Sequence, residues 1–138
     1  MLIIAVLGAL VVLVVASGDR IQLELGIGYP ERSAGPMLVI AHRGDLDRFP
    51  EDTLEAIEAA AAGSAAGIEF DVQRSADGFW YVLHDDTMDR TTDLSGSIHE
   101  LTSTEIDTAT IDGGLGYDTT HVGLGVPRLS DVLDMLRD

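Results

Sequence analysis

The strand–helix–strand pattern between residues 37 and 74 is the feature that most limits how this chain can fold. Residues 37–41 form a short apolar run, which is typical of a strand buried on both faces. An alanine-rich segment at 53–63 follows and ends in glycine, which predicts a helix. Residues 67–74 predict a second strand. Because the connections are short, the pattern predicts an α/β fold.

The elements expected further along the chain fit the same class. A turn signal at 76–78 precedes an expected third strand at 79–84. A short helix is expected at 103–108 and a last helix at 129–137. Between these helices, the glycine-rich residues 113–125 predict a loop.

The first sixteen residues form an almost wholly apolar run. A helix of this length, rising 1.5 Å per residue, falls a little short of the roughly 30 Å hydrocarbon core of a membrane. Two interpretations compete: a short membrane anchor, or a signal peptide with Val14 and Ala16 as its small-residue cleavage pattern. A buried core strand or helix is the least favoured alternative.

These features predict three parts. Residues 1–18 are expected to be a hydrophobic helix that anchors or exports the protein, with the membrane as its partner. Residues 19–36 are expected to be a linker, because glycine and proline are frequent there. Residues 37–138 are expected to form the α/β domain.

The charge of the chain excludes some classes of protein. Its formal net charge is −16, with 24 acidic and 8 basic residues, and all the basic residues are arginine. Such a chain repels the phosphates of nucleic acids, so we expect no nucleic-acid partner. The acidity indicates a solvated surface, or adaptation to high salt. Because cysteine is absent, any metal must be bound by oxygen or imidazole ligands.

Glu69 and Asp71 lie two residues apart on an expected strand, so both side chains point to the same face. Two buried carboxylates are costly unless a cation or other partners offset them. A hard divalent cation such as Ca²⁺ or Mg²⁺ prefers oxygen ligands of this kind. Taken alone, the pair is better explained by an exposed strand face with solvated carboxylates.

Ionisable side chains also follow the two other expected strands. His42, Arg43 and Gly44 come directly after the first strand, and His84 ends the third. A guanidinium matches the geometry of phosphate oxygens, and glycine lets a ligand approach the backbone closely. Imidazole, guanidinium and paired carboxylates together indicate metal-assisted phosphoryl chemistry at the strand ends.

An ordered set of motifs resembles the glycerophosphodiester phosphodiesterase family over about residues 38–137. The motifs are H-R-G at 42–44, P-E-D-T at 50–53, E-F-D at 69–71, D-G at 77–78, H-D-D-T-M-D-R-T-T at 84–92 and V-P-R-L-S-D-V-L at 126–133. The resemblance implies a metal-dependent hydrolase that converts glycerophosphodiesters to glycerol 3-phosphate and an alcohol. It also implies an incomplete (β/α)₈ TIM barrel of about three βα units, here preceded by the N-terminal hydrophobic helix.

The same resemblance implies a set of site residues and a divalent cation, Ca²⁺ or Mg²⁺, as cofactor. They are the acid–base pair His42 and His84, the phosphate-binding Arg43, the metal ligands Glu69 and Asp71, and Glu51 near the metal and the phosphate. Arg90 is expected to brace the loop after His84 rather than to contact the substrate.

The chain departs from the family pattern at two points. The usual P-E-N-T reads P-E-D-T here, so Asp52 adds a charge where the family has an amide. The family's third metal carboxylate and a lysine belong to a fourth strand, which would follow Asp138. We therefore expect the 138 residues to be a fragment that is poorly stable and inactive alone.

Two other functions fit the same motifs. One is a phospholipase D-like barrel enzyme that acts on lysophospholipids or sphingolipids, for which an apolar N-terminal segment is suitable. The other is a non-catalytic, membrane-tethered binding module that has kept the barrel motifs without a complete metal site.

Overall fold

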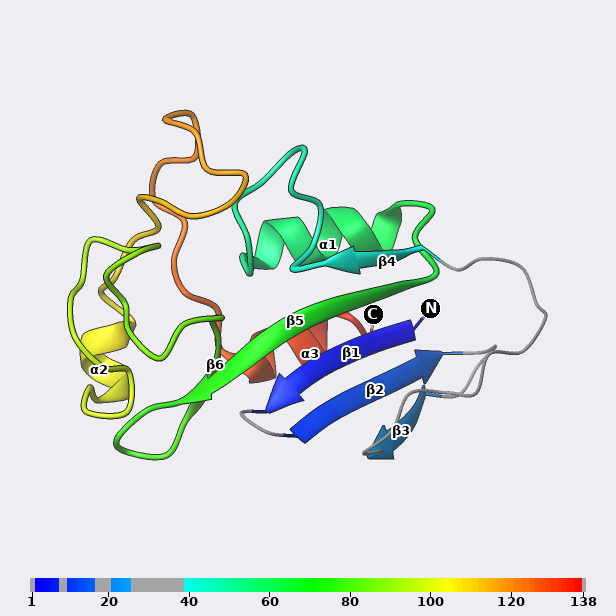
Figure 1. Ribbon diagram of the computed structural model, residues 1–138, viewed down its shortest axis with the longest axis horizontal. Coiled ribbons are helices and arrows are strands. Elements are labelled where there is room, and N and C mark those ends of the chain that lie inside the picture. The colour runs from blue at the N-terminus through cyan, green and yellow to red at the C-terminus, as the bar shows by residue number, and fades with distance from the viewer. Residues whose placement is uncertain (1, 8–9, 17–20, 26–38, 138) are drawn as a thin grey trace.

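The computed structural model describes residues 2–7, 10–16, 21–25 and 39–137 (Figure 1). The strands are β1 (Leu2–Leu7), β2 (Leu10–Ala16), β3 (Ile21–Leu25), β4 (Ile40–His42), β5 (Gly67–Arg74) and β6 (Trp80–Val82). The helices are α1 (Leu54–Ala62), α2 (Ser103–Ile106) and α3 (Leu129–Met135).

The described strands form one six-stranded mixed sheet in which β5 pairs with three neighbours (Figure 1). β4 pairs with β5 in parallel, and His42 lies opposite Glu69 in their register. Because α1 connects these two strands, β4–α1–β5 is the βαβ unit that the sequence predicts. The α/β class is thereby confirmed, and the sheet fits an incomplete barrel.

The apolar face of β5 forms the centre of the first hydrophobic core. Ile68, Phe70 and Val72 are at most 1% exposed. They pack against Ile57 of α1 and Val132 of α3, so both helices cover the same face of the sheet. Burial of a side chain of this size contributes roughly 1.5–3 kcal/mol. The alternate residues of β5 therefore face the opposite side, as the sequence predicts.

Local signals set both ends of α1 as expected. The Thr53 hydroxyl accepts a hydrogen bond from the Ala56 backbone N–H at 3.2 Å, which makes Thr53 the N-cap. At the other end Gly63 is the C-cap, and its N–H donates to the carbonyl of Ala60.

The third expected strand is present, but it does not belong to a third parallel βα unit. β6 runs antiparallel to β5, with Val72 opposite Val82 and Arg74 opposite Trp80. Residues 75–79 alone connect the two strands, and a parallel crossover needs a dozen or more residues. The short connection therefore makes a hairpin, and the chain returns along β5 toward its middle.

The expected N-terminal helix over residues 1–18 is wrong for the residues that the structure describes there. β1 pairs in parallel with β5, from Leu2 opposite Gly67 to Leu7 opposite Val72, and β2 pairs antiparallel with β1. Isoleucine and valine dominate both segments, and β-branched residues favour strands over helices. No described helix has the length and hydropathy needed to cross a membrane.

The expected linker at 19–36 is also partly wrong. Residues 21–25 form β3, which pairs antiparallel with β2. The expected connector at 26–36 lies outside the described residues.

The segment between β6 and α3 has a hydrophobic core of its own, to which α2 contributes Ile106. Its buried members are Tyr81, Leu83, Met88, Ile98, Ile106, Ala109, Ile111 and Val126. A capping box of Thr102 and Glu105 starts α2. In Figure 1 α2 lies on the far side of β6 from α1, whereas the orange glycine-rich part of the segment reaches the loop that precedes α1. The loop that follows β6 is therefore packed on its own core rather than on the helices of the sheet.

We predict that Gly44→Ala destabilises the protein more than Gly96→Ala does. Both glycines have a positive φ, at 97° and 105°, so each substitution costs roughly 1–2 kcal/mol of backbone strain. A Cβ on Gly44 would also lie 2.7 Å from the Cβ of Ala56 in α1, whereas a Cβ on Gly96 would meet nothing within 4 Å. The added overpacking costs roughly 1–3 kcal/mol. Urea unfolding measures both losses, and equal losses would contradict a rigid contact between Gly44 and α1.

Candidate active site

The candidate site begins where β4 and β5 run side by side. The backbone N–H of Arg43 donates to the carbonyl of Glu69 at 2.7 Å, which continues the parallel pairing of the two strands. The Nε2 atom of His42 lies 3.8 Å from Glu69 Oε2. Strand register therefore brings together two side chains that the sequence predicts for the site, one largely exposed and the other largely buried.

Arg43 lies between two carboxylates. Its Nη1 atom donates to Glu51 Oε2 at 3.1 Å, and its Nε atom lies 3.3 Å from Asp71 Oδ2. The second contact is an ion pair without hydrogen-bond geometry. Arg43 also has a φ of 58°, which is rare for a residue with a side chain and marks strain that the surrounding structure must support. The expected phosphate-binding guanidinium is thus held by the protein's own carboxylates.

Glu51 is the most enclosed carboxylate of the site, with 3% exposure. Its Oε2 atom accepts from the backbone N–H of Leu115 at 3.2 Å, and its own N–H donates to the carbonyl of Leu115 at 2.8 Å. Its Oε1 atom lies 2.5 Å from Nη2 of Arg90. All the bonding partners of this carboxylate therefore come from other segments of the chain.

The glycine-rich loop makes this enclosure of Glu51 possible, and the sequence did not predict that role. A Cβ on Gly114 would lie 2.9 Å from Thr91 Cγ2 and 3.3 Å from Glu51 Cδ. A Cβ on Gly116 would lie 2.5 Å from the carbonyl oxygen of Phe49. Both glycines also have positive φ angles. Their close spacing in the sequence was the available signal, since glycine permits such close approach.

His84 lies beyond the end of β6, where the hairpin brings it back beside the middle of β5. The side chain of Gln73 donates to the carbonyl of His84 at 3.0 Å, and the backbone N–H of Leu83 donates to the carbonyl of Asp71 at 3.0 Å. An antiparallel return therefore brings the backbone of His84 beside β5, where the sequence predicts a parallel strand end.

Arg90 braces the loop after His84, as the sequence predicts. Its Nε and Nη2 atoms donate to the carboxylate of Asp85 at 2.7 and 3.0 Å. Asp85 also accepts from Nδ1 of His84 at 2.5 Å. The hydrogen bonds from Arg90 are the main cause that lowers the pKa of Asp85 to about 2, so Asp85 is an anion at neutral pH.

Asp52 is the least satisfied group of the site. It is 4% exposed, has a φ of 57°, and neither of its carboxyl oxygens has a hydrogen-bond partner. Burial is the main cause that raises the pKa of Asp52 well above its usual range, and the charge of Asp71 raises it further. The pKa of Glu69 is also raised, by burial first and by Asp71 second.

The charges of the site leave room for a cation. The carboxyl groups of Glu51, Asp52, Glu69 and Asp71 face the guanidinium groups of Arg43 and Arg90, which are fewer by two. Glu69 Oε2 and Asp71 Oδ2 are buried without a hydrogen-bond partner. Hard divalent cations prefer such oxygens, so the donor set fits one. Across the described residues, no three histidine or acidic side chains are grouped as a metal site. Glu69 and Asp71 would supply two ligands of such a site.

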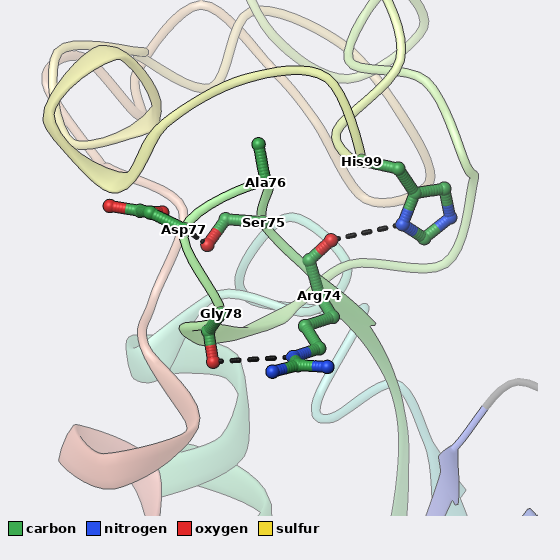
Figure 2. A pocket seen from close by; sticks show the side chains of 6 residues that line it. All are labelled: Arg74, Ser75, Ala76, Asp77, Gly78 and His99. Carbon is green, nitrogen blue, oxygen red and sulfur yellow. Dashed lines mark hydrogen bonds between the residues drawn. The ribbon is translucent and has the colours of Figure 1, made fainter.

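The other histidines lie outside this cluster. A shallow pocket at the β5–β6 hairpin, shown in Figure 2, is lined by His99 together with Arg74, Ser75, Asp77 and Gly78. There its Nδ1 atom lies 2.9 Å from the carbonyl oxygen of Arg74, and the Arg74 side chain reaches the carbonyl of Gly78 (Figure 2). None of the predicted site residues lines this pocket.

His121 packs against Phe49 in the glycine-rich loop, with ring centroids 5.4 Å apart. Its side chain is mostly buried, at 16% exposure.

Comparison with known proteins identifies the family. Residues 42–138 match the Glycerophosphoryl diester phosphodiesterase family. A glycerophosphodiester phosphodiesterase of Caldanaerobacter subterraneus subsp. tengcongensis is 41% identical over 101 residues, which cover 73% of this chain and 41% of that protein. Glycerophosphodiester phosphodiesterase 1 of Bos taurus is 49% identical over 67 residues, covering 49% of this chain and 20% of its own length.

Solved structures agree with the sequence matches. A glycerophosphodiester phosphodiesterase from Agrobacterium tumefaciens aligns with a TM-score of 0.66 and 42% identity, covering 74% of this chain and 43% of that one. An Oleispira antarctica phosphodiesterase in complex with the product sn-glycerol-3-phosphate aligns with a TM-score of 0.64 and 31% identity, covering 72% and 40%.

The fold is thus that of an α/β protein whose solved relatives are phosphodiesterases. The chain belongs to the glycerophosphoryl diester phosphodiesterase family. It spans less than half the length of the relatives and solved structures named above.

We predict that Asp52→Asn, which restores the usual family residue, stabilises the protein at neutral pH in the absence of divalent cations. Because the folded protein disfavours the ionised carboxyl, its stability falls as pH rises above the usual pKa of 3.8 toward the raised folded-state pKa. The amide does not ionise, so the gain grows with pH across this window, to roughly 1–3 kcal/mol. Urea unfolding between pH 4 and pH 8 with a chelator measures it.

The matched control is Asp47→Asn, because Asp47 is exposed. This variant should show no such growth with pH. An Asp52→Asn protein that loses stability at neutral pH would contradict the assignment of Asp52 as an unsatisfied buried acid.

Proposed function

We propose that these residues form part of a metal-dependent site that hydrolyses glycerophosphodiesters to glycerol 3-phosphate and an alcohol. The observation that carries this proposal is the carboxylate pair of β5, Glu69 and Asp71, beside His42 and Arg43. Family membership supports the reaction class. The product bound to the Oleispira antarctica phosphodiesterase supports the substrate class.

Glu69 and Asp71 would hold the divalent cation, Ca²⁺ or Mg²⁺, with carboxylate oxygens that have no hydrogen-bond partner. When bound, such a cation offsets negative charge on the phosphate oxygens. Arg43 lies next to this pair and presents a guanidinium to the same region. Glu51 fixes that guanidinium from the other side, which assigns it a supporting role near the metal and phosphate.

The two histidines would exchange protons with the substrate. The ionised Asp85 can accept but not donate, so Nδ1 of His84 carries a proton, and in the neutral imidazole Nε2 would keep a free lone pair. His42 is largely exposed, and its Nε2 atom lies near Glu69. One imidazole would take a proton from the attacking hydroxyl, and the other would give one to the leaving alcohol.

Substrate choice separates this proposal from the two other functions that fit the motifs. Turnover of glycerophosphocholine supports it. Turnover of lysophosphatidylcholine alone would favour the phospholipase D-like reaction, and binding without turnover of either would favour a binding module.

We predict that His42→Ala and His84→Ala each reduce turnover of glycerophosphocholine by about 10²-fold or more in the full-length protein, because each removes a proton-transfer group. His99→Ala is the control, since His99 lies at the β5–β6 hairpin and does not belong to the candidate active site. Release of choline measures turnover, and circular dichroism checks the fold. Residual activity within a few-fold of the unsubstituted protein in either variant would remove that histidine from the mechanism.

We predict that Glu69→Gln weakens Ca²⁺ and Mg²⁺ binding, because the amide loses the anionic oxygen that a hard cation prefers. Isothermal titration calorimetry on the full-length protein measures binding without any need for turnover. Glu58→Gln removes the same charge from an exposed position on α1 and should leave binding unchanged. Equal affinity in the Glu69→Gln and unsubstituted proteins would exclude Glu69 as a ligand.

A further inference from the structure

A line of alternating charges links the imidazole of His84 to the guanidinium of Arg43. His84 contacts Asp85, Asp85 contacts Arg90, and Arg90 contacts Glu51. Glu51 in turn binds Arg43. The segment that follows β6 therefore reaches back to the turn that precedes α1, and it does so through side chains with opposite charges.

Arg90 joins the segment that follows β6 to the turn that precedes α1. Its Nε and Nη2 atoms both donate to Asp85, at 2.7 and 3.0 Å. Nη2 also forms an ion pair with Glu51 Oε1 at 2.5 Å, without hydrogen-bond geometry. A guanidinium presents its donors in a planar fork, so one side chain can hold two carboxylates in a set arrangement. A lysine ammonium is a single point charge on a flexible stem and cannot fix both partners in this way.

Glu51 is the most restrained member of this line of charges. Its two oxygens are divided between the arginines, with Oε1 near Arg90 and Oε2 bound to Arg43. Because Glu51 is 3% exposed and also accepts from the Leu115 backbone, its carboxylate has little freedom to turn. The buried Glu51 therefore fixes the position of Arg90, and Arg90 in turn fixes the position of Asp85.

We propose that Asp85 and Arg90 are positioning residues for His84. Asp85 holds the imidazole in the tautomer that carries its proton on Nδ1, and Arg90 fixes Asp85 relative to Glu51 and Arg43. This inference rests on the proposed function insofar as the free Nε2 of His84 is the atom that exchanges a proton with the substrate. Without that orientation the imidazole, which is 43% exposed, would be free to rotate and to change tautomer.

A purely structural brace predicts a different result from a positioning residue. A brace needs charge complementarity alone, so Arg90→Lys would preserve its effect. A positioning residue needs the fork, so Arg90→Lys would loosen Asp85 and let both tautomers of His84 occur. Asp85→Asn has a sharper effect, because an amide can donate to Nδ1 and thereby favour the opposite tautomer.

The test combines nitrogen-15 spectra of histidine-labelled full-length protein with steady-state kinetics. The signals of His84 are assigned by their loss in His84→Ala. In the unsubstituted protein at a pH where His84 is neutral, we expect Nδ1 to be protonated. In Asp85→Asn we expect the proton on Nε2 and a fall in kcat of about 10²-fold or more with KM changed less than threefold, since the Nε2 atom of His84 is then in the wrong protonation state for proton transfer but binding is not lost.

Arg90→Lys should give mixed tautomers and an intermediate kcat. This second variant tests the proposal even if Asp85→Asn does not fold. Asp86→Asn is the matched control, because Asp86 is the exposed neighbour of Asp85 and should change neither the spectra nor the kinetics. An unchanged His84 tautomer in Asp85→Asn, or unchanged spectra and kcat in Arg90→Lys, would overturn the positioning roles.

The spectra and the kinetics also separate this inference from the proposed function. A tautomer that changes without any loss of kcat supports the positioning of His84 and contradicts its role as the acid or base.

Discussion

Arg43 joins β4 to two other segments of the chain, β5 and the turn before α1, and the arrangement of the site depends on it. Its backbone N–H extends the pairing of β4 with β5, and its carbonyl accepts from Asp52 at the start of α1. Its guanidinium lies between Glu51 and Asp71. Removing one partner of such a buried pair leaves an uncompensated charge, which costs roughly 3–5 kcal/mol. The positive φ of Arg43 is sustained because all these contacts hold the same residue.

The same region carries more negative charge than its arginines can offset. Asp52 and Glu69 show this imbalance most directly, since burial and the nearby charge of Asp71 raise the pKa of each. Stability alone would not select such a group of acids, because unpaired buried carboxylates oppose folding. The proposed site, which would receive a divalent cation and a phosphate diester, would account for both the excess of carboxylates and the arginine among them.

Much of the fold and of the candidate site could be predicted because the relevant signals are local. Alternation along β5 placed Glu69 and Asp71 on one face, Thr53 and Gly63 marked the ends of α1, and the motif around His84 indicated a brace from Arg90. The N-terminal run was misjudged because a long apolar stretch is compatible with either a helix or buried strands. The antiparallel direction of β6 could have been predicted, since residues 75–79 are too few for a crossover.

The sequence by itself determined approximately where the strands and helices lie within residues 39–137, and which side chains of β5 share a face, because these depend on near neighbours. Only the tertiary structure decided that Arg43 is enclosed by Glu51 and Asp71, and that the glycine-rich loop closes over Glu51. The Leu115–Glu51 hydrogen bond joins residues 64 positions apart. Contacts of that range follow from how the whole chain packs, and no local pattern encodes them.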